Sequence, residues 1–183
     1  MNLFEVALWA AEKHKDQRRK GKCAAPYINH LLEVAALASN ATFGNSLVIT
    51  AALLHDVIED QDVTLAEVRE KFGAQVAYLI EEVTDDKSLP KLVRKKLQIK
   101  RASGLSYGAK AIRIADMVAN LRDTVRDPPV GWTCEDILTY VKHCEDIFIA
   151  ADGRENYLER EFKDASENAR SYCKRIADAA SVE

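Results

Sequence analysis

The chain has 183 residues, of which 48% are hydrophobic and 30% charged, and its formal net charge is −3. This composition predicts one folded domain over residues 1–183, excludes a disordered or fibrous chain, and gives no basic excess for nucleic-acid or membrane-surface binding. The four cysteines form no CxxC pair and no apolar run is long enough to span a bilayer, so we expect a cytoplasmic protein with reduced thiols.

Helix signals cover most of the chain, and no segment alternates as a strand would. Three pairs have the spacing of a capping box: Asn2 with Glu5, Thr64 with Glu67, and Thr133 with Asp136. Ser46 is expected to cap a helix, Gly73 to end one, and Pro90 to open one. The fold class is therefore predicted as all-α, with helices over 2–16, 26–38, 46–58, 64–73, 74–83, from 90 onward, 106–123, 133–151 and 154–180.

Charge is distributed unevenly along the chain. Residues 13–22 hold six Lys or Arg and one Asp, residues 56–86 hold ten Asp or Glu and two Lys or Arg, and residues 87–113 hold nine Lys or Arg and no acid. Runs of this kind are usually solvated helix faces. The alternative is a site in which the acidic block holds a cation and the basic blocks bind a polyanionic small molecule, and the sequence leaves both interpretations open.

Polar residues stand at several positions where apolar ones are expected. His55, next to Asp56, falls on the apolar stripe of its helix, and Asp116 lies on an otherwise apolar helix face. A buried carboxylate is costly unless it is paired or binds a metal. With His30 these residues make a set of two imidazoles and two carboxylates, which suits a divalent ion that keeps positions for water and a phosphate oxygen. A histidine satisfied within the core is the alternative for His55.

Two further acids follow at helical spacing. Glu59 lies one turn after His55, and Asp60 lies one turn after Asp56. This spacing places both carboxylates near the edge of such a metal site, where they could handle protons. An ordinary acidic helix end is the alternative, although acids at a helix C-terminus oppose the helix dipole.

Five segments in this order and spacing resemble a known family. They are Arg18-Arg19-Lys20, Pro-Tyr-Ile-Asn-His at 26–30, His-Asp-Val-Ile-Glu-Asp at 55–60, Glu-Val-Thr-Asp-Asp-Lys at 82–87, and Ile114-Ala115-Asp116 followed by Asn120-Leu121-Arg122. The chain resembles the HD-domain hydrolases of the RelA/SpoT group, above all the stand-alone small alarmone hydrolases. The resemblance runs from about residue 4 to 160 and implies a compact helical bundle of about eight to ten helices.

The resemblance implies removal of pyrophosphate from the 3′ position of ppGpp or pppGpp, usually with manganese (Mn2+). It maps the metal ligands onto His30, His55, Asp56 and Asp116, and the residues that position or deprotonate the attacking water onto Glu59 and Asp60. It maps substrate contacts onto Arg19, Lys20, Lys91, Asn120 and Tyr140. The expected partner is thus a small nucleotide, with no nucleic acid and no membrane, and the sequence does not fix the oligomeric state.

The chain departs from the family pattern at a few positions. Leu31 stands where the family has proline, Gln61 where it has threonine, and Met117 where it has a basic residue. These departures bear on the substrate more than on the metal, because none falls on an expected ligand. Two alternatives therefore stay open: an HD hydrolase of another phosphorylated nucleotide, such as NADPH or a nucleoside monophosphate, and a non-catalytic module that binds the alarmone.

Overall fold

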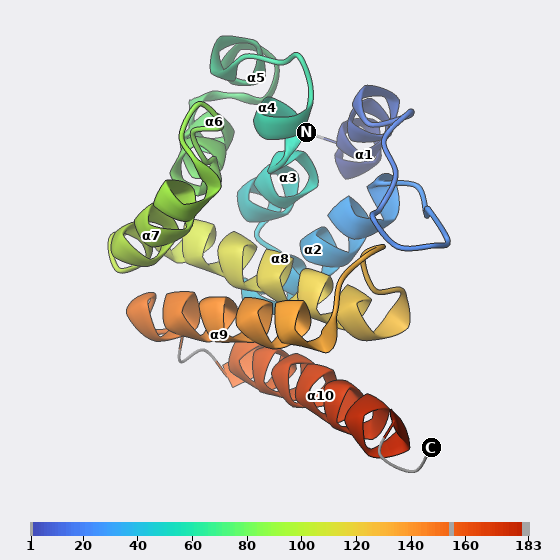
Figure 1. Ribbon diagram of the computed structural model, residues 1–183. Helices are drawn as coiled ribbons and strands as arrows, with labels where there is room; N and C mark the ends of the chain where they lie inside the picture. The colour runs from blue at the N-terminus through green and yellow to red at the C-terminus, as the bar shows by residue number, and fades with distance from the viewer. Residues whose placement is uncertain (1, 154–155, 181–183) are drawn as a thin grey trace.

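The computed structural model describes residues 2–153 and 156–180, which form ten helices and no named strand. This confirms the all-α prediction. Figure 1 shows their arrangement. The helices are α1 (Leu3–Lys13), α2 (Ile28–Ala41), α3 (Ser46–Leu54), α4 (Val57–Asp60), α5 (Leu65–Phe72), α6 (Ala74–Val83), α7 (Lys91–Ala102), α8 (Tyr107–Arg126), α9 (Cys134–Ala150) and α10 (Asn156–Ala180).

Capping residues explain where most of these helices begin. Thr64 and Thr133 each accept the backbone N–H three residues later while the acid at that position bonds back, so two of the three predicted capping boxes are confirmed. The predicted capping box of Asn2 with Glu5 is wrong: the Asn2 side chain caps α1 through the N–H of Phe4, and the N–H of Glu5 bonds the backbone oxygen of Asn2. Gly73, at a φ of 93°, ends α5 in a conformation that a side chain would strain.

The structure differs from the sequence predictions at several helix ends. Asn45, not Ser46, caps α3, because the Asn45 side chain accepts the first free N–H groups. The single helix expected over 46–58 is broken at His55 and Asp56, which separate α3 from α4. Pro90 takes the cap position of α7 rather than its first turn. The predicted start of the last helix at Arg154 lies outside the described residues.

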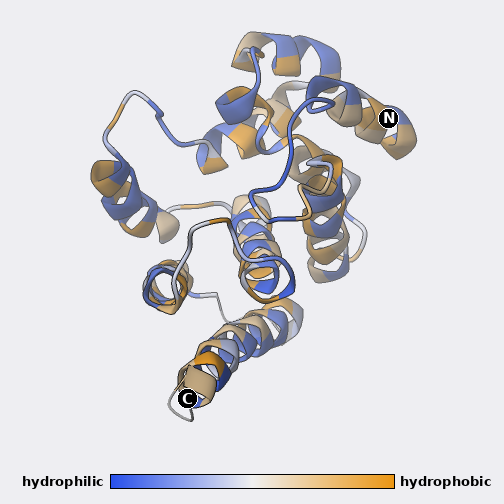
Figure 2. Ribbon diagram, turned by 45° about the vertical axis from the view of Figure 1, so that its right-hand side comes forward, coloured by the Kyte–Doolittle hydropathy of each residue, from blue (hydrophilic) through white to orange (hydrophobic). Residues whose placement is uncertain are grey.

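The long helix α8 forms the centre of the fold. It packs against α2, α3 and α6 on one side and against α9 and α10 on the other, as Figure 1 shows in yellow between the blue and the orange helices. Fully buried Leu31, Leu54, Ile112, Leu121 and Leu158 come from four different helices and fill the space between them. Most of the helices have an apolar and a polar face, which Figure 2 displays, whereas α3 is apolar almost all round. In the described part of the chain, no helix is long and apolar enough to cross a membrane.

Candidate metal centre and substrate cavity

Two imidazoles and two carboxylates meet where α2, the α3–α4 break and α8 come together. His30 Nε2 lies 3.2 Å from Asp116 Oδ1 and 3.7 Å from Asp56 Oδ2. His55 Nε2 lies 3.1 Å from Asp56 Oδ2 and 3.7 Å from Asp116 Oδ1. One donor atom from each of His30, His55 and Asp56 lies within 4.8 Å of the others. The four residues that the sequence suggested as ligands thus converge on one point, although they come from three distant segments.

The orientation of His55 fits a metal ligand. Its Nδ1 lies 2.8 Å from the carbonyl oxygen of Ala52, and a carbonyl can only accept, so Nδ1 carries the proton. Nε2 is then the nitrogen that faces the cluster, where it is buried between Asp56 Oδ2 and Asp116 Oδ1. Burial opposes a charge on this imidazole, but the two carboxylates outweigh it and hold the pKa of His55 well above its usual value. A divalent cation bound at Nε2 would take the place of the proton on this nitrogen, between the same two carboxylates. The donor set of nitrogen and oxygen atoms suits such a cation.

The carboxylates of this cluster are held ionised. Burial opposes ionisation of Asp56, but the neighbouring imidazole of His55 outweighs it and holds the pKa of Asp56 well below its usual range. Tyr27 adds an O–H donor 2.7 Å from Asp56 Oδ2. Asn120 donates from Nδ2 to Asp116 Oδ1 over 2.6 Å. Both acids are therefore oriented by a neutral donor as well as by charge.

Glu59 and Asp60 lie beside this cluster in different surroundings. Glu59 is half-buried, and burial raises its pKa to about 7 even though its Oε1 accepts the backbone N–H of Asp85 over 2.7 Å. Asp60 is bound on both oxygens, Oδ2 by the amide of Gln17 at 2.7 Å and Oδ1 by the ammonium of Lys87. One acid is thus able to exchange a proton near neutrality, and the other is fixed as an oriented carboxylate.

Arg19 is fixed in the cavity wall rather than free in a loop. Its Nε donates to Asp123 Oδ2 over 2.9 Å, and its Nη2 donates to Asn120 Oδ1 over 2.6 Å. The guanidinium also lies 5.5 Å from the ring centroid of Tyr27. Because Asn120 also bonds Asp116, a continuous set of hydrogen bonds runs from Arg19 to the metal cluster.

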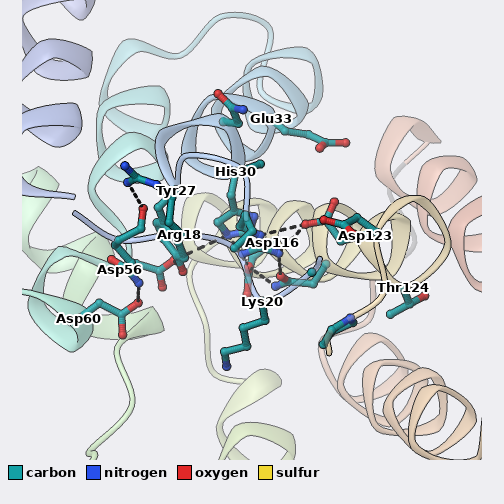
Figure 3. A pocket seen from close by; sticks show the side chains of 18 of the residues that line it. Arg18, Lys20, Tyr27, His30, Glu33, Asp56, Asp60, Asp116, Asp123 and Thr124 are labelled. Carbon is teal, nitrogen blue, oxygen red and sulfur yellow. Dashed lines mark hydrogen bonds and ion pairs between the residues drawn. The ribbon is translucent and has the colours of Figure 1, made fainter. Parts of the chain in front are cut away.

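A cavity of about 640 Å³ opens above the cluster (Figure 3). Most of its basic lining comes from the two basic blocks of the sequence, Arg18, Arg19 and Lys20 from the first and Arg113 from the second, and Arg126 at the end of α8 adds to it. The structure therefore brings the two basic blocks and the acidic block together at one place, which the sequence alone left open. The volume falls within the range of small-molecule sites.

Of the remaining residues predicted to contact the substrate, two line the cavity and one does not. Lys20 and Tyr140 line the cavity, and the ring of Tyr140 packs edge-on against Trp132 with centroids 5.6 Å apart. Lys91 is the exposed first residue of α7 and is not among the described residues that line the cavity. The structure thus brings every predicted site residue except Lys91 to the cavity or the cluster.

Sequence reasoning missed several residues of this site. Tyr27 and Gln17 bond the two carboxylates Asp56 and Asp60, and Arg113 lies 4.0 Å from Asp116 Oδ2. Asp123 was also missed, although it follows Asn120 by three residues and therefore shares its helix face. That spacing is the one local signal that pointed to a further site residue.

A helical bundle in which His30, His55, Asp56 and Asp116 converge defines the HD class of protein. The HD domain family model matches residues 7–148, so the chain belongs to the HD-domain family. The chain is 46% identical over 162 residues to the human (Homo sapiens) protein guanosine-3′,5′-bis(diphosphate) 3′-pyrophosphohydrolase MESH1, covering 88% of this chain and 90% of that one. It is 47% identical over 134 residues to MESH1 of Drosophila melanogaster, covering 73% and 75%.

A solved structure has the same fold. It is that of a metazoan ortholog of SpoT, described as hydrolysing ppGpp and playing a role in starvation responses. The TM-score is 0.85 at 40% identity, over 89% of this chain and 92% of that one. These similarities confirm the resemblance to the RelA/SpoT group that the sequence motifs indicated.

Proposed function

We propose that this protein is a metal-dependent hydrolase that removes pyrophosphate from the 3′ position of ppGpp and pppGpp, giving GDP and GTP. The observation that carries the proposal is the convergence of two imidazoles and two carboxylates beneath a cavity whose walls hold Arg19, Lys20 and Arg113. A guanosine with two diphosphate groups needs both a cation and basic side chains. The MESH1 relatives, which bear this activity in their names, support the same substrate.

We propose His30, His55, Asp56 and Asp116 as the ligands of one manganese ion. The bond from Nδ1 of His55 to the carbonyl oxygen of Ala52 turns Nε2 toward the site, and Asp56 is ionised; the proton on Nε2 would be displaced when the ion binds. When bound, a divalent ion polarises a phosphoryl oxygen and lowers the pKa of a coordinated water toward neutrality. Zinc, iron or cobalt would also suit this donor set.

Glu59 and Asp60 act on the attacking water in this proposal. Glu59, with a pKa of about 7, accepts a proton from the water as the water oxygen bonds to the phosphorus on the ribose 3′ oxygen. The bond from that phosphorus to the 3′ oxygen breaks, and the 3′ oxygen takes up a proton, so pyrophosphate and GDP leave. Asp60, held on both oxygens, orients the water.

The substrate contacts follow from the cavity lining. Arg19 and Lys20 bind phosphate or pack on the base, Asn120 faces the nucleotide, and Tyr140 lines the sugar-phosphate end. The predicted phosphate contact of Lys91 stays a prediction, since this side chain stands outside the lining. We also propose a cytoplasmic location, which the four free cysteines support.

The test is product analysis with purified protein and ppGpp, in manganese and in excess chelator. We expect GDP and pyrophosphate with manganese, none with chelator, and none from the Asp56→Ala protein. Asp178→Ala, at an exposed position of α10, is the matched control and should keep full activity.

Two other outcomes would overturn the proposal in different ways. Turnover of NADPH or a nucleoside monophosphate but not of ppGpp would show an HD hydrolase with another substrate. Tight binding of ppGpp with manganese and no pyrophosphate release would show a binding module.

A further inference from the structure

Asp60 is held by a set of side chains that the proposed chemistry does not use. Gln17 donates from Nε2 to Asp60 Oδ2 over 2.7 Å. On the other side, Gln17 Oε1 accepts from Gln61 Nε2 over 2.6 Å and lies 2.6 Å from Nδ1 of His14. These three residues, His14, Gln17 and Gln61, are called the Gln17 network below. They come from the end of α1, the loop after it, and the residue that follows α4.

The network leaves the Gln17 amide one orientation. Asp60 Oδ2 is a carboxylate oxygen, so the group that faces it must be the NH2 of Gln17. The carbonyl oxygen then points at Gln61 Nε2 and His14 Nδ1, both of which can donate. A flipped amide would set an oxygen against the carboxylate and an NH2 against two donors. The network therefore fixes the position of the Asp60 carboxylate and the direction from which its Oδ2 can accept a further hydrogen bond.

The same network reaches the metal cluster. The ring of His14, only 2% exposed, stacks on the ring of Tyr27 with centroids 5.1 Å apart and planes 13° apart. Tyr27 donates its O–H to Asp56 Oδ2 over 2.7 Å. His14 thus links the support of Asp56 to the support of Asp60, and Figure 3 shows these two carboxylates on the same side of the cavity.

We propose that Gln17 is the positioning residue of Asp60 and that Gln61 holds Gln17 in place. The inference rests on the proposed function, in which Asp60 orients the attacking water. It gives a role to the departure at position 61: a threonine side chain ends at its γ atoms, too short to make the bond that Gln61 makes from its ε nitrogen to Gln17. Misplacing a catalytic group by about 1 Å costs on the order of 100-fold in rate.

The kinetic test compares three glutamine variants. Gln17→Met keeps the length of the side chain without its donor and should lower kcat for ppGpp by about 10- to 100-fold with KM changed less than about twofold. Gln61→Thr should lower kcat less, because Gln17 keeps its contact with His14. Gln75→Met, at an exposed position of α6, is the matched control and should have the wild-type kcat.

A double-mutant cycle separates positioning from a general structural effect. In an Asp60→Asn background, Gln17→Met should change kcat by less than about twofold, because a residue that acts through Asp60 has nothing left to position. Equal losses in the wild-type and Asp60→Asn backgrounds would overturn the inference. So would a Gln17→Met protein with wild-type kcat.

A crystal structure of the Gln17→Met protein gives a readout that needs no substrate. We expect the Asp60 carboxylate to leave the position in which Oδ2 lies 2.7 Å from residue 17. An Asp60 carboxylate that stays in place overturns the inference, whatever the protein hydrolyses. A wild-type protein that releases no pyrophosphate from ppGpp would instead refute the proposed function, and the crystal structures would still decide the role of Gln17.

Discussion

Replacement of Glu59 by glutamine should stabilise the metal-free protein at alkaline pH. Burial raises the pKa of Glu59 to about 7 from an ordinary 4.5, so the folded state holds this proton more tightly than the unfolded state does. Below pH 4.5 both states are protonated and ionisation costs nothing. Above pH 7 both states are ionised, and the folded state bears the full cost of a half-buried charge. Glutamine removes that cost and keeps an oxygen for the N–H of Asp85.

The magnitude follows from the two pKa values. Each pKa unit corresponds to about 1.4 kcal/mol, so the shift from 4.5 to about 7 gives roughly 3.5 kcal/mol as the upper bound for Glu59 at high pH. Solvent in the open cavity screens this partly exposed group, so we expect about 1–2 kcal/mol. At pH 5 the difference should shrink to less than about 1 kcal/mol, because the folded-state carboxyl is then mostly protonated and only the unfolded state has begun to ionise.

The assay is urea unfolding of wild type and Glu59→Gln, with chelator present, at pH 5 and pH 8.5. The difference in unfolding free energy between the two proteins should grow with pH in favour of the variant. Glu81→Gln, at an exposed position of α6, is the matched control and should show no such growth. A Glu59→Gln protein that gains equally at both pH values, or loses stability at pH 8.5, would refute this account of Glu59.

Three further substitutions test other parts of the site. Tyr27→Phe removes the O–H donor from Asp56 and should weaken manganese binding about tenfold, measured by calorimetry; unchanged affinity would mean that this bond does not support the ligand. Arg19→Lys cannot keep both the bond to Asp123 and the bond to Asn120, and should raise KM for ppGpp about tenfold while kcat changes less; an unchanged KM would remove Arg19 from the substrate site. Gly21→Ala would place a Cβ 2.5 Å from the backbone oxygen of Asp127 and push the loop of Arg19 and Lys20 from the wall, so KM should rise severalfold in steady-state assays, and a wild-type KM would contradict this packing.

Local signals were enough to predict most of the helices. Thr64 and Thr133 cap their helices as their spacing predicted, because a capping box depends only on two residues three positions apart. The break at His55 and Asp56 was not predictable in this way, since the apolar spacing continues across it to Ile58. The chain turns there as both side chains reach the cluster, and that is a tertiary effect.

In the candidate site, too, residues with a local sequence signal could be predicted and residues placed only by the fold could not. Asp116 could be singled out because a carboxylate on an apolar face needs a partner, and the structure supplies His30 at 3.2 Å. Gln17 gave no such signal, because a glutamine in a basic loop is an ordinary surface residue. Its importance comes from Asp60, which is 43 positions away in the sequence and 2.7 Å away in the fold.

The central claim is that the four converging side chains hold an ion on which hydrolysis of ppGpp depends. The most direct measurement titrates manganese into metal-free protein while bound metal and pyrophosphate release are followed in the same samples. We predict that both saturate together at one ion per chain and that Asp116→Ala loses both. Pyrophosphate release that persists in excess chelator, or that survives in the Asp116→Ala protein, would contradict the claim.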